Sequence, residues 1–484
     1  MGDGQPLQYP GRLASRPSSL FSSLPEPAVS VSIFDSFLTT SEIIQVFDDA
    51  PVLQAMLRFE VALAKAQAEE GVIPAEAARV IARHGDIADY DVQAIIVASR
   101  RAGSMAIPLV KALTKAVGED DESAATHVHW GSTSQDVIDT GMVLATRDAL
   151  RLIDGALLSL AERLLDLADR HLHTPVLART LMQPAQVTSL GFKFTTWAAP
   201  LVRARRQLKS AADRALQLQL GGAVGTLAVM GDKGPAVARR TAAELGLAVP
   251  DAAWHTQRDE WVRLGLQVAV LAGSLGKLAT DFSLMAQGEI AELAEPTGAG
   301  RGGSTAMPHK RNPVSCMTAL AAAGRVPQRA AGLLANMGQE HERGLGNWQA
   351  ELAEWPGLFI STHGALQAMR EAIEGVHIDT ARMQRNIDAL QGLVYAEAVS
   401  IYLAGAIGKP QAHKLMEELT GRAVSESRPL GEVVTEAVGG DAQLSGQLDQ
   451  AQLRALFDPL VANANAAELA REQIPQLRAD LVQD

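Results

Sequence analysis

The sequence contains a single cysteine, Cys316, and fewer basic than acidic residues. One cysteine excludes an intramolecular disulfide and a metal site of several thiolates, and it suits a reducing compartment, so we expect a cytoplasmic protein. The 43 Lys and Arg against 55 Asp and Glu give a net charge of -12, which argues against nucleic-acid binding. The most apolar run, residues 262–284, is interrupted by Arg263, Lys277 and Asp281, so we expect a helix inside a bundle and no membrane span.

The first thirty residues lack the continuous apolar segment of a signal peptide and are rich in Pro, Ser and Gly. We expect residues 1–30 to form a flexible tail. The whole chain is 47% apolar and 20% charged, a composition typical of soluble globular proteins. At 484 residues it is long enough to bury a large core.

Two stretches contain no Asp or Glu at all, although the chain as a whole is acidic. Residues 296–339 carry only basic charges, from Arg301, Lys310, Arg311, Arg325 and Arg329. Such a local positive island suits an anionic ligand. In the second window, 171–212, a loop at 179–184 offers hydrogen-bond donors, and the helix after it presents a basic face to solvent or to acidic partners. The basic residues of this window are Arg179, Lys193, Arg203, Arg205, Arg206 and Lys209.

Apolar residues recur every three to four positions along most of the chain, which predicts an all-α fold without alternating βαβ units. The 260–293 helix is apolar on all sides, so we expect it in the middle of a bundle or of an oligomer. Helices of this length are typical of bundles. The expected helices lie at 41–115, 140–171, 189–220, 260–293 and 314–337, the last kinked at Pro327, and shorter helices follow after about residue 362.

The stretch 302–313 combines a glycine-rich turn with adjacent hydroxyls, a lysine and an asparagine. Residues 298–303 fit the dinucleotide fingerprint G-x-G-x-x-G, but that motif requires a preceding strand, and a long helix precedes it here. A mobile glycine loop that closes over an anionic ligand fits better. Lys310, the backbone N–H groups of the turn and the start of the next helix would stabilise an alkoxide, which makes Ser304 a candidate proton-transfer residue. The alternative is that Ser304 and Thr305 are ordinary loop hydroxyls.

A second polar loop, residues 127–136, precedes the first long helix. One interpretation of this loop is structural, with Ser134 or Asp136 as the cap of that helix. None of the eleven histidines lies at a convincing metal-binding spacing, so we expect no metal site.

Three blocks resemble, in order and spacing, signatures of the fumarase/aspartase superfamily: 129–136 (HWGSTSQD), 221–226 (GGAVGT) and 303–313 (GSTAMPHKRNP). The resemblance extends over most of the chain. It implies three helical domains, at 31–139, 140–365 and 366–484, the middle one being a bundle of five long helices. It also implies a homotetramer with a core of twenty helices and with active sites shared between subunits.

The resemblance assigns site residues by position. Ser304 matches the catalytic base and acid of the superfamily, and Lys310 and Asn312 match residues that hold a substrate carboxylate. The chemistry moves a proton at the carbon beside a carboxylate while a group leaves or joins the next carbon, and it requires no metal or organic cofactor. We therefore expect a small anionic polycarboxylate as the substrate. The other implied substrate contacts are Thr133, Ser134, Gln183, Gln257, Arg258, Thr305 and Arg343.

Leu181 distinguishes this chain from most lyases of the superfamily, which carry a Thr-His pair in the loop that here reads Arg179-Thr180-Leu181. Leucine cannot protonate a departing group, so the group must depart unaided. A carboxylate does so, because its conjugate acid has a pKa of about 4. The 3-carboxy-cis,cis-muconate cycloisomerases meet this condition, although Pro184 is a departure, since some members carry His there. Further blocks that resemble this subfamily are 254–259, 307–313, 341–343 and 392–399.

The resemblance thus implies a lactonising cycloisomerase of aromatic (protocatechuate) catabolism that converts 3-carboxy-cis,cis-muconate to 4-carboxymuconolactone. Ser304 would supply the proton, and Lys310, Asn312 and the loop amides would stabilise the enediolate. Two alternatives stay open. One is adenylosuccinate lyase or a related fumarate-releasing C–N lyase, and the other is a non-catalytic binding or structural protein on the same scaffold.

Overall fold

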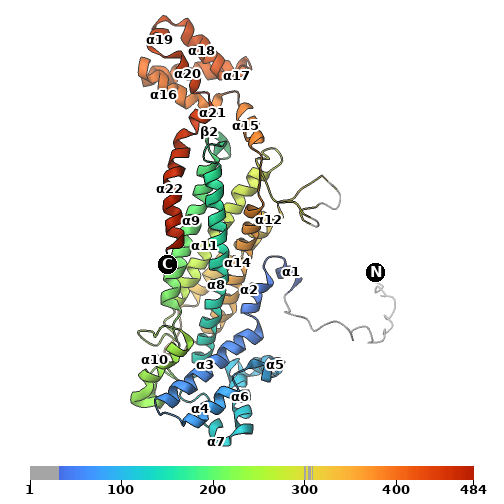
Figure 1. Ribbon diagram of the computed structural model, residues 1–484, viewed down its shortest axis with the longest axis vertical. Helices are drawn as coiled ribbons and strands as arrows, with labels where there is room; N and C mark the ends of the chain where they lie inside the picture. The colour runs from blue at the N-terminus through green and yellow to red at the C-terminus, as the bar shows by residue number, and fades with distance from the viewer. Residues whose placement is uncertain (1–31, 299–300, 304–306, 308, 484) are drawn as a thin grey trace, which may run out of the picture.

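The computed structural model describes residues 32–298, 301–303, 307 and 309–483. Long helices run side by side along the molecule (Figure 1), and the predicted all-α fold is confirmed. The predicted kink is confirmed as a break at Arg325, after which Pro327 lies in the first turn of a new helix. The long helices are α8 (Ser134–Arg170), α9 (Leu190–Ala215), α11 (Asp259–Ala286), α12 (Val314–Gly324) continued by α13 (Val326–Ala335), and α14 (Asn347–Glu374).

Short helices cover the end of the bundle at which α8, α11 and α14 begin (Figure 1). Helix α3 packs along α8, and α10 packs on α3, so this end shares one apolar core with the bundle. The elements here are α1 (Ile33–Ser36), α2 (Ser41–Val46), α3 (Asp49–Glu69), α4 (Ala75–Arg83), η1 (Ile87–Asp89), α5 (Val92–Ala102), α6 (Ala106–Asp120), α7 (Glu122–Ala125), η2 (Ala228–Lys233) and α10 (Gly234–Leu245).

The opposite end carries two small antiparallel sheets and a group of short helices with an apolar core of its own. The predicted loop at 179–184 is instead part of a β-hairpin, β1 (Pro175–Thr180) with β2 (Gln183–Ser189). The other sheet pairs β3 (Leu293–Ala294) with β4 (His377–Ile378). The helices are α15 (Thr380–Asp388), η3 (Leu393–Tyr395), α16 (Ala396–Ile407), α17 (Lys409–Ser425), α18 (Leu430–Gly440), α19 (Ala442–Gln447), α20 (Gln450–Ala455) and α21 (Pro459–Ala462).

The last helix, α22 (Ala464–Val482), returns along α8 and α9 (Figure 1). The boundaries of the three expected domains stay a prediction. The tail predicted at residues 1–30 lies outside the described residues.

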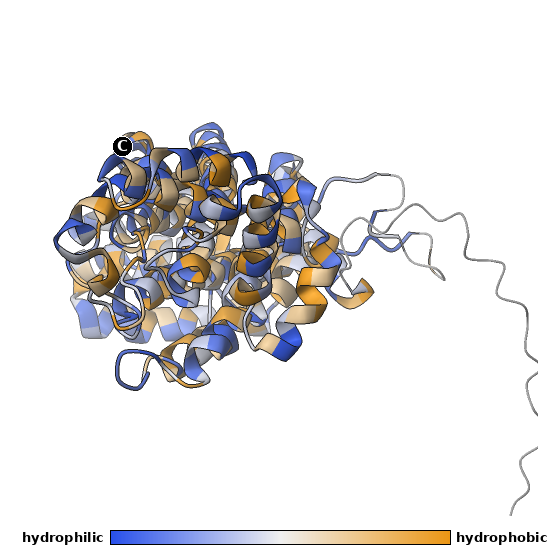
Figure 2. Ribbon diagram, turned by 90° about the horizontal axis from the view of Figure 1, so that it is seen from below, coloured by the Kyte–Doolittle hydropathy of each residue, from blue (hydrophilic) through white to orange (hydrophobic). Residues whose placement is uncertain are grey.

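Helix α11 lies among the other long helices and packs on α9, α12, α13 and α14. By length and composition alone it is apolar enough to cross a membrane, but side chains such as Leu271 and Phe282 are fully buried in the bundle. Seen end on (Figure 2), hydrophobic residues gather between the helices. One side of α11 stays uncovered, where Val270 is 60% exposed, and the adjacent α12–α13 segment exposes Met317 and Leu334.

Candidate active site

Thr133, Ser134 and Arg343 meet at the N-terminus of α8, and we call them the hydroxyl cluster. Thr133 is the N-cap of α8 and shares a capping box with Asp136. The prediction of Ser134 or Asp136 as the cap is wrong, because Ser134 is the first helical residue and Asp136 is the third. Arg343 donates from Nη1 to Thr133 Oγ1 (2.8 Å) and from Nη2 to Ser134 Oγ (3.4 Å). Burial lowers the pKa of Arg343, and the nearby carboxylates of Asp136 and Asp139 act in the opposite direction. A cation and a helix N-terminus at one place favour an anionic ligand.

Asp136 connects the segments around the hydroxyl cluster through hydrogen bonds to its carboxylate. Its fully buried carboxylate accepts hydrogen bonds from the backbone N–H groups of Thr133 (3.0 Å), Gly221 (3.0 Å) and Gly222 (2.9 Å), and it lies 2.7 Å from His255 Nε2. One carboxylate therefore joins the sequence blocks around residues 133, 221 and 255.

The glycine block at 221–225 is required by this close packing. Gly222 has φ +73°, and a Cβ atom there would lie 2.9 Å from the carbonyl oxygen of Gly131. A Cβ atom at Gly221 would lie 2.9 Å from Cε1 of His255. The block thus serves to close the backbone over Asp136 and its partner ring.

Arg258 lies beneath the hydroxyl cluster and is only 2% exposed. Its guanidinium donates to Asp139 (2.9 and 3.3 Å), to Glu351 (2.5 and 3.2 Å) and, at 3.5 Å, to the carbonyl of Trp254, whose ring it also covers at 4.5 Å. Burial raises the pKa of Glu351, and Arg258 opposes that rise. Every donor of Arg258 is engaged within the core, with Asp139, Glu351 and Trp254 as acceptors, and its role as a substrate contact stays a prediction.

Gln257, by contrast, is exposed beside this buried arginine. The preceding residue, Thr256, donates to the backbone carbonyl of His341 (2.9 Å), which ties the segment before α11 to the loop that carries Arg343. The structure thus brings Thr133, Ser134 and Arg343 together and holds Gln257 on a segment joined to them.

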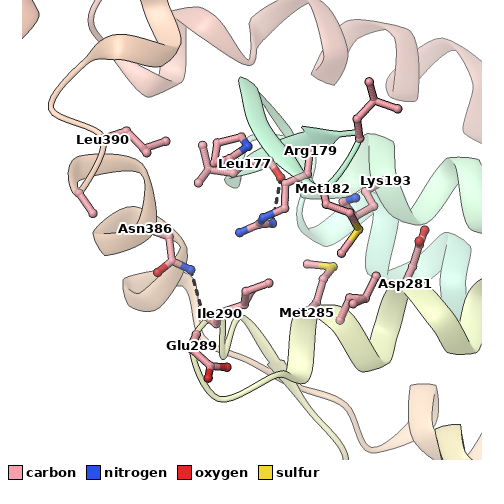
Figure 3. Close-up of a pocket in the computed structure, with 14 residues that line it drawn as sticks. Leu177, Arg179, Met182, Lys193, Asp281, Met285, Glu289, Ile290, Asn386 and Leu390 are labelled. Atoms are coloured by element: carbon pink, nitrogen blue, oxygen red, sulfur yellow. Dashed lines mark hydrogen bonds between the residues drawn. The ribbon is translucent and has the colours of Figure 1, made fainter. Parts of the chain in front are cut away.

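At the far end of the bundle, a pocket of about 560 Å³ opens between the β1–β2 hairpin, α11 and α15 (Figure 3). We call it the hairpin pocket. Arg179 reaches into it and forms a two-pronged ion pair with the fully buried carboxylate of Glu292 (2.8 and 3.1 Å). Asn386 donates to the same carboxylate (2.9 Å). This network fixes the orientation of Arg179. Glu292 accepts from Arg179 on β1 with two hydrogen bonds and is itself held by Asn386 on α15.

The walls of the hairpin pocket are largely apolar, and one further cation lines them. Leu181 and Met182 form its rim at the tip of the hairpin, where both have positive φ (49° and 68°) and are 97% and 69% exposed. Lys193 on α9 contributes the cation. Burial lowers the pKa of Lys193, and the attraction of Asp281 opposes this only in part. Gln183, the first residue of β2, is exposed at the same tip.

Lys310 and Asn312 lie on the segment between α11 and α12. The backbone N–H of Asn312 donates to the carbonyl of Gly302 (2.9 Å), which closes the neck of the loop between them. Within the part of the chain that the structure describes, Lys310 and Arg311 form no ion pair. The other three cations are paired: Arg301 with Glu295 and Glu371, Arg325 with Asp35, and Arg329 with Glu354. The predicted positive island is thus reduced to the loop itself. Ser304 and Thr305 lie outside the described residues.

The hydroxyl cluster and the hairpin pocket do not meet within one chain. Arg258 immediately precedes α11, and the other end of α11 lines the hairpin pocket. A helix of 28 residues spans about 40 Å, so the hydroxyl cluster and the hairpin pocket lie at opposite ends of the bundle. No group of three or more His, Cys, Asp or Glu suited to a metal ion occurs among the described residues.

Sequence reasoning did not identify Glu292 as the partner of Arg179, nor Asn386 as a second donor to Glu292, and it expected Lys193 only as part of a basic helix face. Glu292 is 113 residues from Arg179 in sequence, and Asn386 is 94 residues from Glu292, so no local pattern reveals this network. The two strands flank Leu181 and Met182 and pair with a register shift between Ala178 and Arg179, and neither turn residue is of a type that marks a hairpin turn in the sequence.

A protein-family model described as lyase matches residues 37–327. A 3-carboxy-cis,cis-muconate cycloisomerase of Bradyrhizobium diazoefficiens is 45% identical, over 90% of this chain and 95% of that protein. One of Pseudomonas aeruginosa is 46% identical, over 88% of this chain and 92% of that protein. The crystal structure of 3-carboxy-cis,cis-muconate lactonizing enzyme from Pseudomonas putida has a TM-score of 0.86 and 41% identity, and it covers 93% of this chain and 99% of that chain.

The chain therefore belongs to the lyase family, as an enzyme of the fumarase/aspartase superfamily. Its place in that family is with the 3-carboxy-cis,cis-muconate cycloisomerases, so the predicted resemblance is confirmed.

Proposed function

We propose that this chain converts 3-carboxy-cis,cis-muconate to 4-carboxymuconolactone in the cytoplasm. The proposal is supported by its relatives, which are named 3-carboxy-cis,cis-muconate cycloisomerases. The observation in the structure that carries this choice is the hairpin tip. Leu181 and Met182 occupy the tip, and neither side chain can donate a proton. A reaction in which the departing group is a carboxylate needs no such donor, because a carboxylate is a stable anion at neutral pH.

In the proposed reaction, one carboxylate oxygen of the substrate adds to the carbon–carbon double bond and closes a five-membered lactone. The electron pair of that double bond moves toward the neighbouring carboxylate as an enediolate, and Ser304 then gives a proton to the carbon beside it. Lys310 and Asn312 hold this carboxylate as its negative charge grows. The reaction is an isomerisation, so no atom is gained or lost.

We also propose a homotetramer in which three chains contribute to each site. Two observations support it. The hydroxyl cluster and the hairpin pocket are separated by the length of α11, about 40 Å. Apolar side chains are uncovered on α11, at the hairpin tip and along α12–α13, where a further subunit would bury them; they are Val270, Leu181, Met182, Met317, Leu320 and Leu334.

A mixture of two inactive variants tests the shared site. Co-expression of Ser304→Ala and Arg343→Met chains is expected to restore about a quarter of wild-type activity, because each residue is then intact in half of the chains and the two come from different chains. The measurement is the specific activity of the purified mixed assembly. Co-expression of Ser304→Ala with Lys310→Met is the matched control. Ser304 and Lys310 lie on the same loop, so each site takes both residues from a single chain. Every chain in this mixture lacks one of the two, so no recovery is expected. Equal recovery in both mixtures, or none in either, contradicts the shared site.

A spectrophotometric assay with three substrates tests the reaction itself. Loss of the conjugated-diene absorbance is expected with 3-carboxy-cis,cis-muconate, whereas no fumarate release is expected from adenylosuccinate or argininosuccinate. The reason is that these C–N lyase substrates have an amine leaving group, which has to be protonated as it departs. The side chains at the hairpin tip, Leu181 and Met182, cannot donate that proton. Activity on adenylosuccinate alone would overturn the proposal in favour of a C–N lyase. Inactivity on all three would favour a non-catalytic protein.

A further inference from the structure

Lys193 is a cation of the hairpin pocket that the proposed mechanism does not yet use. Its Nζ makes no hydrogen bond or ion pair with any residue in the described ranges. The other cations nearby are engaged, since Arg179 pairs with Glu292 and Lys277 pairs with Asp281. An ammonium group that lines a pocket with its donors unused is placed to bind an anion.

The position of Lys193 is set by the helix on which it lies. Helix α9 begins directly after β2, with Ser189 as its cap accepting from the N–H of Phe192. Lys193 is thus in the first turn, where the helix dipole also favours an anion nearby. Its Nζ lies 6.0 Å from the centre of the Trp197 ring, one turn further along, and Trp197 is held by its own hydrogen bond to Asp281 (2.9 Å). Lys193 therefore lies at the edge of the pocket (Figure 3), with its ammonium group near the ring of Trp197.

The charges of the substrate decide which anion this is, given the function proposed above. Of the three carboxylates, one becomes the enediolate that Lys310 and Asn312 hold. A second loses its charge as its oxygen forms the new C–O bond. A cation fixed on that second group would stabilise the charge that the reaction removes, and so would raise the barrier to lactonisation. The third, the 3-carboxylate, keeps its full charge throughout and is the group that a fixed ammonium suits.

We propose that Lys193 binds the 3-carboxylate of the substrate and so selects the tricarboxylate over the corresponding dicarboxylate. The proposal rests on the proposed function, because that function supplies the third carboxylate. Lys193 takes no part in bond making. It interacts equally with the ground state and the transition state, which is uniform binding.

Lys193→Met is expected to raise KM for 3-carboxy-cis,cis-muconate by about tenfold or more and to change kcat little, because a partly buried charge pair is lost in both states. cis,cis-Muconate, which lacks only the 3-carboxylate, is expected to inhibit the wild type and the variant with the same Ki. Tricarballylate and glutarate, which also differ by one carboxylate, provide a second pair of inhibitors. The Ki of tricarballylate is expected to rise in the variant, and the Ki of glutarate is expected to stay the same. Lys193→Arg keeps the charge and is expected to recover part of the affinity.

Lys209→Met is the matched control, because Lys209 is exposed on the same helix, and it is expected to behave as wild type. Circular dichroism and assembly size establish that each variant is folded. If the wild type does not turn over 3-carboxy-cis,cis-muconate, the proposed function fails. If the wild type is active and Lys193→Met leaves KM unchanged, weakens the dicarboxylates as much as the tricarboxylates, or lowers kcat alone, the role of Lys193 is wrong while the function stands.

Discussion

Replacing Ser304 by alanine is expected to lower kcat for lactonisation by about 100-fold to 10,000-fold, the range for loss of a positioned proton-transfer group. The proton that completes the product has to reach the carbon beside the stabilised carboxylate. Ser304 is the residue that the family resemblance assigns as the base and acid, and it lies on the loop that also carries Lys310 and Asn312. The measurement is the initial rate of diene absorbance loss at saturating substrate, so that a change of KM does not enter.

The neighbouring hydroxyl provides the matched control for this result. Thr305→Val removes the adjacent hydroxyl with little change of volume, and it is expected to raise KM more than it lowers kcat. The thermal stability of both variants is compared with that of the wild type, so that a loss of activity is not mistaken for a loss of folded protein. Turnover by Ser304→Ala within a few-fold of wild type would remove Ser304 from the mechanism, and equal losses in both variants would indicate a disturbed loop.

The helices were predictable because their signal is local. The apolar period fixed the long segments, and Pro327 marked the break between α12 and α13. The hairpin was not predicted, because its turn carries no local signal. Its two turn residues, Leu181 and Met182, have positive φ. Two-residue hairpin turns with positive φ usually contain Asn-Gly, and large apolar residues at these positions do not indicate a turn.

The site was predictable only where the motifs themselves line it. The blocks around Thr133, Gly221 and Gln257 do converge, and the physical reason is the buried carboxylate of Asp136, which a sequence shows merely as a helix cap. Glu292 as the partner of Arg179 and the unused ammonium of Lys193 follow from packing between distant segments. A composition window cannot distinguish a charge in a pocket from one in solvent.

Arg258 shows this limit most clearly, because its motif suggests a ligand contact and its surroundings do not. Arg258→Leu is expected to destabilise the folded protein by about 3–5 kcal/mol, since it leaves Asp139 and Glu351 buried without a counter-charge. The measurement is the urea midpoint at fixed protein concentration, because an oligomer unfolds in a concentration-dependent way.

Three comparisons distinguish a positioning role for Arg258 from a contact with substrate. Gln257→Ala changes the exposed neighbour and is expected to keep the wild-type midpoint while raising KM. Arg258→Leu combined with Glu351→Leu removes one of the two stranded carboxylates, so part of the lost stability is expected to return. A direct substrate contact predicts the reverse for Arg258→Leu: an unchanged urea midpoint, a raised KM and no rescue by the second change.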